Sequence, residues 1–206
     1  LSTIKVHDKE GNVSLLLHRV DGTLSWRSLL HGELRFREIR IEQPDLIIHR
    51  DSSGAIHVAG FALNSELTDD TNGFSDWLLR QRQVIINNAS ILWQDDLRGA
   101  PELELLVNFR LENHGNRHRF GLRATPPAES TAQVDIRGDF TGESLNRPDQ
   151  WRGQLFTQID HADIGALRAW LPFPPEIKFS PGVGALRLWS RVDRGNIKKL
   201  TADMRL

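Results

Sequence analysis

The sequence predicts a mainly β fold of long antiparallel strands, with two or three short helices at the edges of the sheet. Apolar and polar residues alternate with period two over most of the chain, as they do in strands. Gly, Asn, Asp and Pro interrupt the alternation at intervals that are typical of turns. Several alternating runs approach eleven residues, which would extend about 35 Å at the usual rise per residue. The strands are therefore expected to be longer than average.

The first expected helix is a single turn over Ser25–His31. Trp26, Leu29 and Leu30 form an apolar group there, and Gly32 ends it. This turn is expected to pack at the edge of the sheet.

The next strand is expected over Glu33–Gln43, with a bulge near Arg37 and Glu38. Its apolar residues change parity along the strand, from Leu34 and Phe36 to Ile39 and Ile41. An extra residue between the two pairs would return all four to one face, because side chains alternate strictly along a strand. Such a bulge would also curve the sheet.

The middle of the chain begins with an acidic stretch, Asn64–Gly73, that reads as an exposed loop. A helix is expected after it, over Phe74–Arg82, with Ser75 as its N-cap. Its apolar residues, Trp77, Leu78 and Leu79, would face the sheet.

The clearest strand is Glu102–Glu112, in which every second residue is apolar and Leu106 alone breaks the alternation. The turn "NHGN" joins it to the alternating run "RHRFGLRAT", so the two runs are expected to form a hairpin. The stretch "TPPAES" then reads as a loop.

The last third repeats the same pattern. Further strands are expected in "QVDIRGDF", "GALRLWSRVD" and "IKKLTADMRL". A third helix is expected over Asp163–Leu171, ended by Pro172.

Composition excludes several classes of protein. The 206 residues carry 26 Lys and Arg against 27 Asp and Glu, a formal net charge of −1, which gives no basic surface for nucleic acid. There is no cysteine, so disulfides and thiol chemistry are excluded. No apolar run approaches the roughly 20 residues that span a bilayer. The chain opens at Leu1 and ends within a strand pattern, so we expect it to be a section of a longer protein.

The apolar face of these strands must be covered by something. The pattern alone favours a sandwich or a closed barrel, in which two apolar faces pack together. It also permits a single curved sheet whose apolar face is left for a ligand, since few helices are available to cover it.

Several segments resemble the AsmA-like superfamily, which includes AsmA, TamB and YhdP. The N-terminal block follows the pattern of the membrane-proximal repeat of that family, and "DWLLRQRQVIINNASILWQDDLRGAP", "NRHRFGLRATPP" and "LRAWLPFP" are most similar to the N-terminal periplasmic region of YhdP-type proteins. The N-terminal match rests on Leu24, Leu29, Leu30, Gly32, Leu34, Ile41, Pro44, Leu46, Arg50, Asp51 and Gly54.

The resemblance implies a curved, groove-forming sheet in a long periplasmic protein that is anchored in the inner membrane of Gram-negative bacteria. It implies phospholipid transport between the inner and outer membranes without chemistry, so no enzyme, catalytic residue, metal or cofactor is expected. The partners would be phospholipid acyl chains, the remainder of the same long chain and envelope proteins. Within it, 1–206 would form one β-rich segment: an AsmA-like repeat over 1–60, central strands over 61–150 and further repeat-like strands over 151–206.

The alternating strands supply the candidate lining of the groove. These residues share the apolar parity of their strands and are expected to face a common concavity: Leu103, Leu105, Val107, Phe109, Leu111, Phe120, Leu122, Val134, Ile136, Phe140, Leu186 and Leu188. The competing interpretation is that they form a sealed core.

Other candidate sites have simpler explanations. His114 and His118 have a zinc-like spacing, but they flank a hairpin turn and share no face. The acidic pairs Asp69 with Asp70 and Asp95 with Asp96 are expected to be solvated. The arginines Arg117, Arg119 and Arg123 are expected on the wet face of a strand, where a lipid head group is a second reading. The six tryptophans are expected to anchor strand ends and helix contacts rather than to bind sugars or membranes.

Two functional classes remain open at this stage. A lipid conduit requires an open apolar groove, and a periplasmic scaffold for outer-membrane assembly requires exposed strand edges.

Overall fold

The computed structural model describes residues 4–7, 13–25, 35–58, 61–62, 76–126, 133–144, 147–163 and 183–205 of the chain. Fourteen strands in this part form one sheet, so the expected mainly β fold is confirmed. The strands are β1 (Ile4–His7), β2 (Val13–Leu17), β3 (Arg19–Leu24), β4 (Phe36–Glu42), β5 (Asp45–Arg50), β6 (Ile56–Val58), β7 (Phe61–Ala62), β8 (Gln83–Asp95), β9 (Ala100–His114), β10 (Arg117–Thr125), β11 (Gln133–Thr141), β12 (Arg152–Asp163), β13 (Val183–Asp193) and β14 (Asn196–Arg205).

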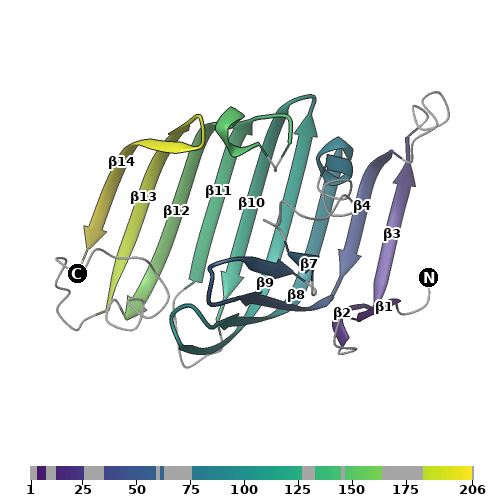
Figure 1. Ribbon diagram of the computed structural model, residues 1–206, viewed down its shortest axis with the longest axis horizontal. Coiled ribbons are helices and arrows are strands. Elements are labelled where there is room, and N and C mark those ends of the chain that lie inside the picture. The colour runs from purple at the N-terminus through teal and green to yellow at the C-terminus, as the bar shows by residue number, and fades with distance from the viewer. Residues whose placement is uncertain are drawn as a thin grey trace.

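The main path of the sheet runs β1-β2-β5-β8-β9-β10-β11-β12-β13-β14. From β8 to β14 each strand pairs antiparallel with the next one in the sequence, as a meander of long strands (Figure 1). The hairpins predicted from the alternation therefore form. Among the described strands β9 is the longest, with fifteen residues.

The sheet is not antiparallel throughout, and this corrects the expectation. β4 and β5 run end to end along β8, and both pair with it in parallel. The break between them falls at Gln43, whose φ is 50°, and at the fully buried Pro44. Opposite that break, β8 carries an extra residue at Asn88, whose φ is 51°, and its ladder with β9 shifts register there. One long strand thus spans two short ones.

The predicted bulge in the fourth strand is confirmed. Thr23 pairs with Glu38 and Leu24 pairs with Phe36, which leaves Arg37 as the extra residue. In the described residues, β4, which contains this bulge, begins at Phe36.

The helix expected over Phe74–Arg82 is present over residues 76–80 of the described part, while Phe74 and the predicted N-cap Ser75 lie outside it. It ends before Arg82 because β8 begins at Gln83. Trp77 and Leu78 pack on a core of Ile39, Val84 and Leu111, as the sequence predicted for this helix. A 3-10 turn, η1 (Pro148–Gln150), precedes β12. Both lie at the upper ends of the strands in Figure 1.

The helices expected over Ser25–His31 and Asp163–Leu171 fall on residues 26–34 and 164–182, outside the described part of the chain. The loop Asn64–Gly73 and most of "TPPAES" also lie outside it.

Candidate functional site: the apolar face of the sheet

The strand registers place the twelve candidate lining residues on one face of the sheet. One cross-strand row illustrates this. It runs from β8 to β14 through the paired residues Ile86, Phe109, Leu122, Ile136, Thr157, Leu188 and Ala202. Residues that pair directly across a ladder point to the same side, so the row forms a band across seven strands. Thr157 is the polar member of this row.

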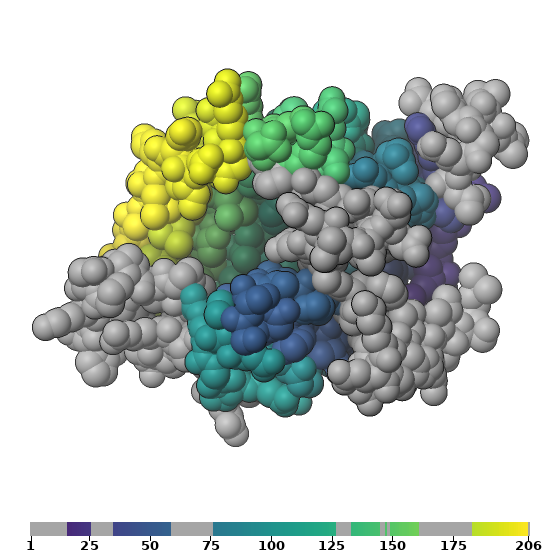
Figure 2. All heavy atoms as spheres, in the orientation of Figure 1, coloured from purple at the N-terminus to yellow at the C-terminus, as the bar shows by residue number. Residues whose placement is uncertain are grey.

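These side chains are mostly half-buried rather than sealed. Of the twelve, only Val107, Leu111 and Leu186 are buried, at 3%, 6% and 5% exposure, and the other nine are intermediate. A sandwich would bury such residues more completely, because a second sheet would pack about 10 Å above the first. In Figure 2 the surface over β11 and β12 (green) is recessed behind β14 (yellow) and behind the lower turn of β8 and β9 (teal).

Phenylalanine rings cover the glycines of this face. Phe120 and Phe140 stack with centroids 6.1 Å apart and planes at 4°, and the Phe120 ring occupies the space that a Cβ on Gly138 would need. Phe140 likewise fills the space above Gly153, where a Cβ would lie 2.6 Å from its ring. Because the glycines have no side chain, the rings lie across them and keep this part of the surface apolar.

The upper end of the face is closed by a buried hydrogen-bonded cluster. Asn113 donates from Nδ2 to the carbonyl oxygens of Leu78 and Gln81, at 3.1 and 2.6 Å, and its Oδ1 lies 2.7 Å from Nδ1 of His118. The Nε2 atom of His118 lies 3.0 Å from the carbonyl oxygen of Gly142. Burial lowers the pKa of His118. The cluster ties the helix to the β9–β10 hairpin.

The lower end carries an ion pair between Arg50 and Asp95. The Nε atom of Arg50 donates to Asp95 at 2.9 Å, Nη2 makes a second bond, and the guanidinium lies 5.7 Å from the ring centroid of Trp93. Asp95 is 4% exposed, so the expectation that it is solvated was wrong: its partner on the adjacent parallel strand allows the charge to be buried. Arg50 holds the pKa of this carboxyl below its usual range. Asp96 is exposed, and its Oδ2 lies 2.7 Å from Nε2 of His49.

The opposite face is charged, as the alternation predicted. Arg117 makes two hydrogen bonds to Asp139, at 2.8 and 2.6 Å, and Arg119 donates to the same carboxylate at 3.2 Å. These arginines hold the pKa of Asp139 below its usual range, with Arg117 the larger cause. Leu106, the residue that breaks the alternation, lies on this face and is 48% exposed.

No metal site accompanies these features in the described residues, where no group of three or more His, Asp and Glu side chains could hold an ion. His114 pairs with Arg117 and His118 pairs with Asn113, so the two histidines project from opposite faces, as predicted. Asp69 and Asp70 lie outside the described part of the chain.

Sequence reasoning missed the contribution of β8 to the apolar face. Val84 and Ile86 have one parity and Ala89, Ile91 and Trp93 the other, yet all pair with residues of the apolar face of β9. The bulge at Asn88 switches the parity. The sequence signal for this bulge was the pair "NN" inside an apolar run, because Asn is enriched among non-glycine residues at positive φ.

Comparison with known proteins decides the family. The model of the family described as YhdP protein matches residues 1–206. The chain belongs to the YhdP family. No curated protein and no solved structure matches it. In the described residues of this YhdP-family chain, no helix has the length and apolar character needed to cross a membrane.

Proposed function

We propose that the apolar face of this YhdP-family chain holds phospholipid acyl chains, as one section of a groove along which lipids pass between the inner and outer membranes. In this proposal the chain lies in the periplasm, within a longer protein anchored to the inner membrane. The remainder of that protein continues the path.

The continuous, half-buried apolar face carries the proposal. All fourteen strands of the described residues belong to one sheet, so none of them forms a second sheet over this face. Nine of the twelve candidate residues remain partly open. Moving a lipid tail from water to such a surface gains about 0.8 kcal/mol per CH₂, so a largely apolar face favours the binding of tails even with Thr157 in its central row.

The test is native mass spectrometry of the chain purified gently from membranes. Leu122→Glu places a charge in the middle of the apolar row, and Thr125→Glu places the same charge at an exposed position on the opposite face of the same strand. We expect phospholipid adducts on the wild type and on Thr125→Glu, and at least about tenfold fewer on Leu122→Glu, because an unpaired carboxylate is costly in an apolar site.

Circular dichroism of both variants checks that the sheet is retained. Adducts that persist on Leu122→Glu, or that are absent from the wild type in repeated preparations, would contradict the proposal. The second result would favour a scaffold, for which the exposed edge strand β14 is the available surface.

A further inference from the structure

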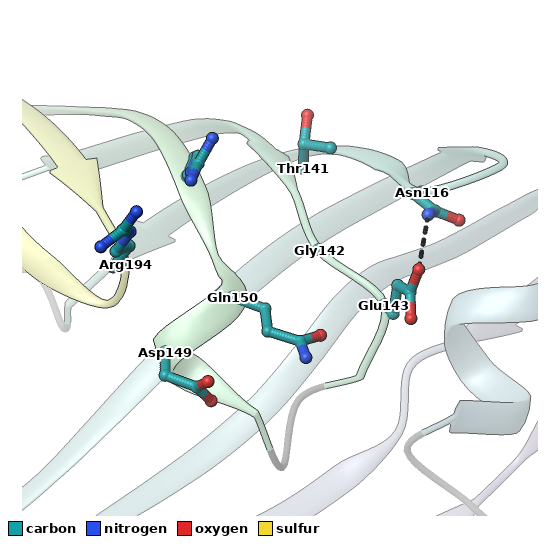
Figure 3. A pocket seen from close by; sticks show the side chains of 8 residues that line it. Asn116, Thr141, Gly142, Glu143, Asp149, Gln150 and Arg194 are labelled. Carbon is teal, nitrogen blue, oxygen red and sulfur yellow. Dashed lines mark hydrogen bonds between the residues drawn. The ribbon is translucent and has the colours of Figure 1, made fainter.

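A polar hollow of about 430 Å³ lies at the rim of the sheet (Figure 3). Two hairpin turns and η1 form its walls, and its lining residues are Asn116, Thr141, Gly142, Glu143, Asp149, Gln150, Arg152 and Arg194. No role in lipid binding was expected of any of them from the sequence pattern.

Backbone contacts fix the position of these walls. The β13–β14 turn consists of Arg194 and Gly195, with φ of 52° and 71°, and Gly195 donates to the carbonyl oxygen of Trp151 at 3.1 Å. The β9–β10 turn is held in the same way, because the N–H of Gly142 donates to the carbonyl oxygen of Asn116 at 2.9 Å. The side chains of the hollow are therefore presented by anchored turns.

The charges of the lining are balanced and only partly paired. Arg152 donates to Asp193 at 3.0 Å, and Glu143 accepts one long bond of 3.3 Å from Asn116. Among the described residues, the guanidinium of Arg194 and the carboxylate of Asp149 have no partner. Figure 3 places Arg194 and Glu143 on opposite sides of the hollow, with Gln150 between them.

The hollow adjoins the apolar face through Trp151. A Cβ on Gly142 would lie 2.6 Å from the Trp151 ring, which also lies 6.2 Å from Phe140 between ring centroids. The indole N–H donates to the carbonyl oxygen of Ser144 at 2.6 Å. Tryptophan thus joins a polar edge to an apolar surface, the setting in which its amphipathic ring is favoured.

We propose that this hollow binds the head group of a zwitterionic phospholipid, with its phosphodiester at Arg194 and its primary ammonium at Asp149, which lies on the same side of the hollow as Arg194 (Figure 3). The acyl chains then lie on the apolar face beyond Trp151, so the inference rests on the proposed function. Two lining arginines against two lining carboxylates give no net charge, which suits a ligand of both signs better than a purely anionic one.

The experiment compares two short-chain lipids with identical tails, dihexanoyl phosphoethanolamine and dihexanoyl phosphoglycerol, by NMR titration of the chain. We expect the wild type to bind the ethanolamine lipid about threefold more tightly, the scale of one exposed ion pair. The double variant E143Q/D149N should lose this preference, because it weakens the ethanolamine lipid and binds the anionic glycerol lipid at least as tightly as the wild type does. R194Q should weaken both lipids by about threefold, because both carry the phosphate.

The matched control is R191Q, which removes an exposed arginine of β13 outside the hollow and should change neither affinity. Equal binding of the two lipids by the wild type, or an unchanged preference in E143Q/D149N, would overturn the head-group site. If either of these results is found but Leu122→Glu abolishes binding of both lipids, only the head-group site is rejected and the acyl-chain function stands. Failure of both lipids to bind the wild type overturns both proposals.

Discussion

At the scale of single residues, the Arg50–Asp95 pair shows how a charge is tolerated at the end of an apolar face. The carboxylate of Asp95 is closed off from solvent and the side chain of Arg50 is 17% exposed, so each relies on the other for compensation. Breaking such a pair from one side leaves an uncompensated charge, which is far more costly than loss of a surface pair. The pair therefore holds β5 in register with β8.

We expect Asp95→Asn to lower the free energy of unfolding by about 3 kcal/mol, because it leaves the Arg50 guanidinium without its counter-charge. Asp139→Asn on the charged face is the control and should cost no more than about 1 kcal/mol, since that pair is solvated. Urea unfolding measures both. Similar losses in the two variants would show that the Arg50–Asp95 pair has no special role.

The same carboxyl predicts a pH dependence. Arg50 lowers the pKa of Asp95 in the folded state, so its stabilisation is complete above the unfolded pKa of about 4 and is lost as the pH falls below it. Urea unfolding at pH 7 and pH 3 should therefore show a smaller loss on acidification for Asp95→Asn than for the wild type. An equal loss in both proteins would rule out this linkage.

At the scale of elements, alternation was sufficient for the regular strands and insufficient where a bulge intervened. From Leu103 onward β9, β10 and β11 keep one parity with the exception of Leu106, so their apolar residues could be assigned to one face from the sequence. The bulge in β4 was predicted because its apolar residues changed parity over a short interval. β8 hid the same change within the mostly apolar run "VIINNASILW", and its parallel pairing with β4 and β5 depends on contacts distant in sequence.

Substitutions at Asn88 test the bulge of β8. Its φ is 51°, and its N–H donates to Oδ1 of Asn108 at 3.0 Å. We expect Asn88→Val to cost about 1–2 kcal/mol of unfolding free energy, because a β-branched residue is strained in this conformation, while Asn88→Gly stays close to the wild type. Urea unfolding separates the two, and an equal stability of the Val and Gly variants would contradict the bulge geometry.

At the scale of the whole molecule, the described strands form one sheet in which strands contact mainly their sequence neighbours. Stability then varies along the sheet. The centre around β8 and β9 holds most of the buried residues, whereas β14 is exposed at every position except Asp203, with Ile197 and Leu200 at 65% and 58%. Such a structure need not unfold in a single cooperative transition.

Hydrogen exchange followed by mass spectrometry tests this gradient. Amides of β9 and β10 should exchange at least about tenfold more slowly than those of β14, because edge strands open without disturbing the centre. The β8–β9 and β13–β14 hairpins, both antiparallel, provide the internal comparison. Uniform protection across the sheet would instead indicate one cooperative unit.

The ordered path of ten strands also sets a length scale for the proposed lipid path. Neighbouring strands lie about 4.8 Å apart, so the path from β1 to β14 measures roughly 43 Å along the sheet. One leaflet of a bilayer core is about 15 Å thick, half of the full hydrocarbon layer. If the proposed function holds, a tail stretched along the path crosses about three strands, so this section has room for several lipids one behind another, and each could advance only after the lipid ahead of it has left.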